Sequence, residues 1–179
     1  MKTLSNNLSL QALTLEDQPA LYALMEKIYT PAYKHLWEDH GQWYLQHNYT
    51  YDNLAKELED SNATYQFVLY EGEKVGIYRL LYNQPLEDFP DKQATKLHRL
   101  YLHPKLHGKG AGKILMDFAK KEAKEQKSSM LWLEAMDTQK QALKFYEKQG
   151  FMISGDFKLN FSLMHKELRG MYKMYYNLL

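Results

Sequence analysis

The chain of 179 residues contains no cysteine and no long apolar segment. The absence of cysteine excludes disulfide bonds, zinc sites built on thiolates and a cysteine nucleophile. No apolar run approaches the roughly eighteen residues of a membrane-spanning helix, and the first residues, Met1–Asn7, lack the apolar core of a signal peptide. We therefore expect a cytoplasmic protein with no membrane partner.

An excess of charge of either sign is also missing, since 23 Lys and Arg residues face 22 Asp and Glu residues. A chain without a strong overall field is not expected to bind nucleic acid, and any anion site must be local. The length fits one domain that buries about 70% of the surface of its unfolded chain. We expect a single domain over residues 1–179.

Periodicity and turn residues outline the secondary structure. Thr14 and Asp17 form a capping pattern before an amphipathic helix that Pro31 is expected to end. The expected elements are a strand over 8–14, this helix, a helix over 52–58, a hairpin of strands 65–70 and 74–82, a strand over 96–102, a helix over 110–126, a strand over 130–135, a helix over 139–149, and strands over 151–161 and 168–176. This order predicts an α/β fold with a mixed sheet and helices on both faces.

A glycine-rich segment joins the strand that ends at Leu102 to the helix that follows. Its residues are His107, Gly108, Lys109, Gly110, Ala111, Gly112 and Lys113. Glycines allow the backbone to approach a ligand closely, and N–H groups at a helix N-terminus bind anions. The segment therefore predicts a pyrophosphate site.

Two common phosphate motifs do not fit this segment. A nucleotide-triphosphate loop needs a glycine where His107 stands and a hydroxyl residue where Ile114 stands. A dinucleotide fingerprint needs G-x-G-x-x-G, whereas Gly108, Gly110 and Gly112 occupy alternate positions. Both interpretations fail on spacing.

The remaining pattern, x-G-x-G-x-G between a strand and a helix, resembles motif A of the GNAT N-acetyltransferase superfamily. His107 stands where that family usually has Gln or Arg. A second segment is similar to the family's motif B: Leu131–Ala135 followed by A-x-x-F-Y-E-K-x-G-F over Ala142–Phe151, with Gln139 where many members have Asn. The resemblance covers about residues 96–155. It implies a mostly antiparallel sheet of about seven strands.

The resemblance also implies acetyl-CoA as co-substrate and direct attack of a bound amine on the thioester. The pyrophosphate would lie against His107–Lys113, and the pantetheine arm along the backbone of Leu100, Tyr101 and Leu102. Gln139 and Tyr146 would complete the coenzyme A site. No metal is required, and the histidines at 98, 103 and 107 straddle a strand end and a turn, which is a poor zinc arrangement.

Three side chains are candidates for proton transfer. Tyr146 stands where the family commonly has the tyrosine that protonates the departing thiolate, and a phenol with an ordinary pKa near 10 is protonated at neutral pH. Lys96 occupies a position where relatives often carry an acid, so His98 is the candidate for the proton path. Glu134 is a weaker candidate for the same role.

An aromatic region after the first helix is the candidate acceptor site. Tyr33 and Trp37, together with Glu38, could hold a cationic small-molecule amine or polyamine by cation–π contact and ion pairing. Tyr29, Trp43 and Asp39 lie in the same region. The alternative, that these aromatic residues are core residues, fits the sequence equally well.

Other functions remain open on the sequence. A catalytically silent acyl-CoA-binding or sensing domain would keep the phosphate loop and lack the proton-transfer residues, and Lys96, His107 and Gln139 are departures of that kind. A phosphate-binding interaction module and a protein N-terminal or lysine acetyltransferase are further alternatives. The sequence also allows a homodimer.

Overall fold

A computed structural model describes residues 1–178 of the chain. They form two compact units, the first of Met1–Arg79 with Arg99–Gly112 and the second of Leu80–His98 with the chain from Lys113 onward. The expectation of one domain over residues 1–179 stays a prediction. None of the helices within residues 1–178 combines the length and apolar character needed to cross a membrane.

The strands belong to one mixed, mostly antiparallel sheet in the order β1-β2-β3-β4-β5-β6-β8-β7. Their bounds are β1 Lys2–Thr3, β2 Leu8–Ala12, β3 Ala63–Tyr70, β4 Glu73–Leu81, β5 Ala94–Leu102, β6 Met130–Met136, β7 Met152–Lys158 and β8 Gly170–Asn177. The helices are α1 Gln18–Tyr33, α2 Gln42–Asn48, α3 Tyr51–Leu58, α4 Ala111–Glu125 and α5 Lys140–Lys148. The predicted fold class is confirmed, with eight strands in residues 1–178 in place of about seven because β1 was not predicted.

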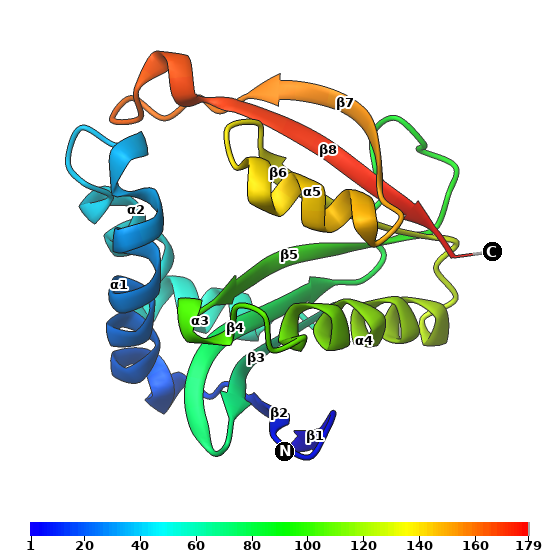
Figure 1. The fold of residues 1–179 in the computed structure, drawn as a ribbon, viewed down its shortest axis with the longest axis horizontal. Helices are drawn as coiled ribbons and strands as arrows, with labels where there is room; N and C mark the ends of the chain where they lie inside the picture. Colours follow the sequence, from blue (N-terminus) through cyan, green and yellow to red (C-terminus); the bar gives the residue numbers. More distant parts are fainter. Residues whose placement is uncertain (179) are drawn as a thin grey trace. The chain divides into compact units, whose positions relative to one another are not determined.

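The first unit begins with short antiparallel strands (Figure 1). β2 pairs with β3 from Leu8 opposite Tyr70 to Ala12 opposite Gln66. Buried Leu8 and Leu10 alternate with half-buried residues, which is the pattern of a strand with one covered face. The β3–β4 hairpin turns at Glu71 and Gly72, whose φ angles of 52° and 83° suit a tight hairpin turn.

Helix α1 starts as predicted and ends later than predicted. Thr14 and Asp17 form a capping box at the short 3₁₀ turn just before it. The expected end at Pro31 is wrong, because Pro31 lies inside the last turn and α1 continues to Tyr33. A proline there removes one backbone hydrogen bond, while the Tyr29 and Tyr33 rings stack with centroids 4.7 Å apart across the same turn.

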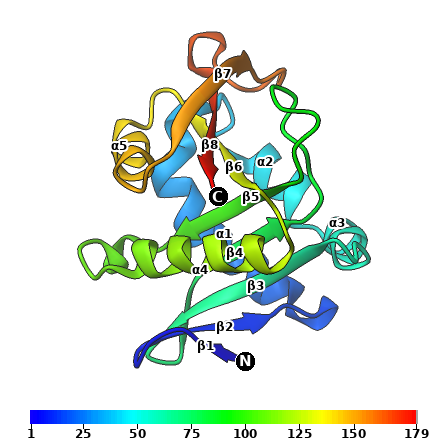
Figure 2. The same ribbon diagram turned by 90° about the vertical axis from the view of Figure 1, so that its right-hand side faces the viewer.

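In the second unit, β6 runs parallel to β5 and antiparallel to β8, and Figure 2 shows β7 beside β8. The loop between β4 and β5 packs on this part of the sheet through the Trp132 indole, whose Nε1 donates to the Gln84 carbonyl at 2.7 Å. A small core forms beneath it. It contains the buried residues Leu86, Ala94, Met130 and Trp132 and the partly buried Phe89 and Tyr175.

Candidate functional site

The glycine-rich loop is open and has a backbone that only glycine adopts readily. A 3₁₀ turn over Pro104–Leu106 follows β5, and α4 begins at Ala111. Gly108 and Gly110 have φ angles of 75° and 73°, and a Cβ atom built on either would meet no atom within 4 Å. The conformation therefore requires these glycines, although the space around them is empty. Such a loop at the N-terminus of a long helix presents backbone N–H groups to an anion.

Two lysines, one within this loop and one just after it, make few contacts with their side chains. The Lys109 ammonium lies 4.8 Å from the centre of the Tyr70 ring. Lys113 pairs with Asp117 one turn further along α4 at 2.6 Å, and both side chains are more than half exposed. Exposed pairs of this kind contribute at most about 1 kcal/mol. The Lys113 ammonium can therefore leave Asp117 at little cost.

The end of β5 lies very close to β4. A Cβ atom on Gly76 would collide with the Tyr101 carbonyl oxygen and lie 2.8 Å from Leu102 Cδ2. The His103 N–H also donates to the Val75 carbonyl at 2.7 Å. Gly76 is therefore required for the close approach that fixes Leu100–Leu102.

Pairing on the other side of β5 is short. The parallel ladder with β6 joins Ala94–Lys96 to Met130–Trp132 and includes no later residue of the described chain. β5 nevertheless continues to Leu102, and β6 to Met136. Leu100–Leu102 therefore lie outside this ladder.

Four tyrosines, one of which is Tyr101, form a cluster. Tyr29 and Tyr33 come from α1, Tyr44 from α2 and Tyr101 from β5. Tyr29 stacks on Tyr44 with centroids 4.3 Å apart, and the Tyr33 and Tyr101 rings are perpendicular at 5.9 Å. The hydroxyl oxygens of Tyr44 and Tyr101 lie 3.2 Å apart in a hydrogen bond. We call Tyr29, Tyr33, Tyr44 and Tyr101 the tyrosine cluster.

The phenols of this cluster are weak acids. Burial, with a contribution from Tyr44, raises the pKa of Tyr33 to about 12. Burial also raises the pKa of Tyr29 and of Tyr101 well above the ordinary value. All three rings therefore remain neutral at physiological pH.

The predicted acceptor residues have different environments. Tyr33 belongs to the tyrosine cluster and is half-buried, while Glu38 is exposed. Trp37 is only 2% exposed and donates its indole N–H to the Tyr29 hydroxyl at 3.0 Å. The structure thus gives Trp37 a packing role beneath the cluster. Tyr44 was not predicted as a site residue; its presence in an aromatic-rich segment was the only signal for it in the sequence.

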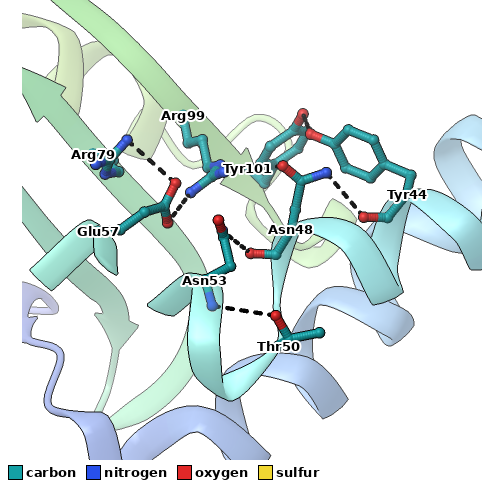
Figure 3. A network of polar contacts seen from close by, with 8 residues as sticks. All are labelled: Tyr44, Asn48, Thr50, Asn53, Glu57, Arg79, Arg99 and Tyr101. Carbon is teal, nitrogen blue, oxygen red and sulfur yellow. Dashed lines mark hydrogen bonds and ion pairs between the residues drawn. The ribbon is translucent and has the colours of Figure 1, made fainter. Parts of the chain in front are cut away.

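A buried polar network supports the same region (Figure 3). Glu57 on α3 accepts from Arg99 at 2.7 Å and lies 3.4 Å from Arg79, and both arginines are 5% exposed. Arg99 also donates to Asn48 Oδ1 at 3.3 Å, and Asn48 Nδ2 donates to the Tyr44 carbonyl at 2.9 Å. The network ties α2 and α3 to β5, two residues before Tyr101.

The predicted proton-transfer residues, His98 and Tyr146, both belong to the second unit. His98 is half-buried on β5. Tyr146 is half-buried on α5, with its ring 5.4 Å from Phe145 and 6.0 Å from Phe151. Gln139 precedes α5 as its cap residue. Their roles stay predictions.

Lys96 and Glu134 form an ion pair at 3.0 Å, which gives each a structural partner. Within residues 1–178, no group of three or more His, Asp and Glu side chains could hold a metal ion.

This chain is similar to known proteins in sequence and in fold. The profile of the acetyltransferase (GNAT) family matches residues 22–151. An uncharacterized N-acetyltransferase of Lactobacillus delbrueckii is 26% identical over 60% of this chain and 62% of its own length, and the uncharacterized N-acetyltransferase YjgM of Escherichia coli is 30% identical over 79% of this chain and 80% of its own. The chain thus spans less than two thirds of the Lactobacillus relative.

One similar solved structure is the spermidine N-acetyltransferase of Vibrio cholerae in complex with CoA and spermine. It has a TM-score of 0.69 and is 17% identical over 97% of both chains. At this identity the likeness supports the fold.

Proposed function

This chain belongs to the acetyltransferase (GNAT) family, and we propose that it transfers the acetyl group of acetyl-CoA to a primary amine of a small molecule. Family membership implies an acetyl-CoA-dependent N-acetyltransferase. The observation that carries the proposal is the open loop at the N-terminus of α4, where Gly108 and Gly110 have left-handed backbone and the first N–H groups of the helix suit a pyrophosphate.

The remaining coenzyme A contacts follow from the same loop and from β5. His107, Lys109 and Lys113 would supply charge or hydrogen bonds to the phosphates, with Ala111 and Gly112 in the first turn of α4. The backbone of Leu100, Tyr101 and Leu102, which lies outside the β5–β6 ladder, would bind the pantetheine arm as an added strand does. Gln139 would contact the coenzyme near α5.

The reaction is a direct attack within a ternary complex. The neutral amine attacks the thioester carbonyl carbon, a tetrahedral intermediate forms, and its collapse breaks the carbon–sulfur bond and releases the coenzyme A thiolate. The amine proton leaves through the His98 imidazole, and the Tyr146 hydroxyl protonates the thiolate. The products are an amide and free coenzyme A.

The acceptor is a small amine bound near Tyr33, Trp37 and Glu38. The spermine complex of the Vibrio cholerae protein makes polyamines one candidate class. The tyrosine cluster supplies aromatic faces that attract an ammonium ion. A cytoplasmic location and a homodimer stay predictions.

Thiol release from acetyl-CoA, measured with a panel of small amines, tests this function. Turnover with at least one amine, together with coenzyme A binding in calorimetry, is the expected result. Coenzyme A binding without turnover on any amine would indicate the silent acyl-CoA-binding domain. Turnover only on peptides with a free N-terminus or a lysine would indicate a protein acetyltransferase, and failure to bind coenzyme A would overturn the proposal.

A further inference from the structure

The tyrosine cluster lies where an acceptor must arrive if the proposed function is correct. Tyr101 belongs to the stretch Leu100–Leu102 that would carry the thioester, and its ring lies within the cluster. We infer that Tyr33, Tyr44 and Tyr101 form the acceptor subsite, and that it selects a primary amine with one ammonium and a flat apolar body over a polyamine. This inference rests on the proposed function.

The rings of the tyrosine cluster pack around one buried member, Tyr29. Tyr29 is 3% exposed and stacks on Tyr33 at 4.7 Å and on Tyr44 at 4.3 Å. Tyr33, Tyr44 and Tyr101 pack around this ring and are each of intermediate exposure. The ring planes of Tyr33 and Tyr101 are at 90° to each other. Two perpendicular rings can hold an ammonium on one face while a flat apolar group packs on the other ring.

The phenols also offer hydrogen bonds without charge. One proton is used between the Tyr44 and Tyr101 hydroxyls, which lie 3.2 Å apart, so the pair keeps one further proton and free oxygen lone pairs. Raised pKa values keep Tyr33 and Tyr101 neutral. Lone pairs and ring faces together recognise one ammonium without a carboxylate.

The charges around the cluster argue against a polycation. Burial is the largest cause of the raised pKa of Tyr101, and the neighbouring groups that add to it are other tyrosines, namely Tyr44, Tyr49, Tyr33 and Tyr29. Asp39 adds to the raised pKa of Tyr29. The Asp39 carboxylate already accepts hydrogen bonds from the backbone N–H groups of Gly41 at 3.0 Å and Trp43 at 2.6 Å. The buried Arg99 guanidinium lies 5.4 Å from the Tyr49 ring, which contacts Tyr44 edge to face. Glu57 pairs with both Arg79 and Arg99, so the buried network behind Tyr49 offers no carboxylate to a second ammonium group.

The polar network of Figure 3 makes the subsite rigid before a ligand arrives. Asn48 holds the Tyr44 carbonyl at 2.9 Å and accepts from Arg99 at 3.3 Å, while Arg99 is fixed by Glu57 at 2.7 Å. Tyr101 is thus linked to the buried Arg99 along the backbone of β5, and Tyr44 is linked to it through Asn48 on α2. A preorganised site of this kind loses little entropy on binding and selects by shape.

The test compares 2-phenylethylamine with spermidine on the full chain. We expect kcat/KM for 2-phenylethylamine to exceed that for spermidine by at least about tenfold. Tyr33→Leu should raise the KM for 2-phenylethylamine by roughly fivefold to thirtyfold, the range of one lost cation–π contact, and leave the KM for acetyl-CoA unchanged. Tyr33→Phe keeps the ring and should stay within about threefold of the parent protein.

Tyr51→Leu is the matched control, because Tyr51 is 57% exposed on α3 and lies outside the cluster. It should leave both KM values unchanged. A preference for spermidine that is lost in Glu38→Gln would overturn the inference while supporting the proposed function. Tyr33→Leu kinetics equal to those of the parent protein would also overturn the inference.

Calorimetric binding of 2-phenylethylamine in the presence of coenzyme A separates the two proposals. Binding that weakens in Tyr33→Leu supports the subsite even if no amine is turned over, in which case the proposed activity fails alone. If 2-phenylethylamine neither binds nor reacts, the subsite is overturned, whatever other amines do.

Discussion

The Lys96 ammonium lies 3.0 Å from the Glu134 carboxylate and 4.4 Å from the centre of the Trp132 ring. Lys96 on β5 and Trp132 on β6 are the last paired residues of the parallel ladder between these strands. Glu134 follows two residues after Trp132 on β6. Lys96 stands where the family resemblance suggests an acid. It is therefore a partner of the Glu134 carboxylate and the Trp132 ring.

A double-mutant cycle of Lys96→Met and Glu134→Gln should give a small coupling energy. The Lys96 and Glu134 side chains are 14% and 30% exposed, so solvent screens their attraction in part. We expect a coupling of about 0.5–1 kcal/mol in urea unfolding, reduced in 1 M salt. A coupling above about 3 kcal/mol would contradict this description and indicate a desolvated pair.

Asp17 should make stability depend on acid pH. Burial acts to raise the pKa of Asp17, but hydrogen bonds from Thr14 and the ion pair with Lys74 at 3.1 Å outweigh it and lower the pKa below its ordinary value. A lowered pKa stabilises the folded chain above about pH 4 and loses this effect as the pH falls through the folded value.

Asp17→Asn should therefore destabilise the protein by about 1 kcal/mol at pH 7, because Asn keeps an acceptor for Thr14 and loses only the charge. The difference should shrink toward pH 2, as the pH falls through the lowered folded pKa of Asp17. Urea unfolding at both pH values measures it, with Lys74→Met as the partner control. An equal loss at both pH values would show that the ion pair contributes nothing.

Gly110→Glu should abolish coenzyme A binding in calorimetry. The new carboxylate would enter the open space beside the loop and repel a pyrophosphate, and a side chain at φ 73° costs about 1–2 kcal/mol of stability. Gly72→Glu is the matched control, since its φ is 83°, its Cβ also meets no atom within 4 Å, and it lies in a hairpin. The control should lose similar stability and still bind. Unchanged binding by Gly110→Glu would show that the loop does not hold the phosphates.

The sequence was sufficient to predict those features that are determined by residues close together in the chain. The Thr14–Asp17 capping box, the Glu71–Gly72 turn and the glycines at 108 and 110 each act within a few residues, and the structure has them as predicted. Helix α2 was missed because its start depends on Gly41 at φ 89° and on Asp39, which accepts two backbone N–H groups there. Neither feature produces the periodic pattern of apolar residues from which a helix is predicted.

The acceptor region could not be assigned from sequence because its parts are distant in the chain. Tyr44 and Tyr101 are 57 residues apart, and nothing in a sequence shows that their hydroxyls meet. Trp37 has the same aromatic character as its neighbours, yet it is buried and donates to Tyr29. Which aromatic residue lines a surface and which one packs beneath it is decided by tertiary contacts.

Tyr146→Phe tests the proposed acid of the reaction. The substitution removes only the hydroxyl and keeps the ring near Phe145 and Phe151, at 5.4 Å and 6.0 Å. Loss of a general acid should lower turnover by about a hundredfold and leave coenzyme A affinity and the melting temperature nearly unchanged. Thiol-release kinetics, calorimetry and thermal unfolding measure the three quantities.

Tyr176→Phe provides the control for Tyr146→Phe within the same unit. Its ring lies 3.9 Å from the Lys120 ammonium, a contact that phenylalanine preserves, so turnover should not change. If Tyr146→Phe stays within about twofold of the parent protein, Tyr146 does not protonate the thiolate. If its turnover and melting temperature fall together, the hydroxyl stabilises the fold of α5, and the fall in turnover does not identify an acid.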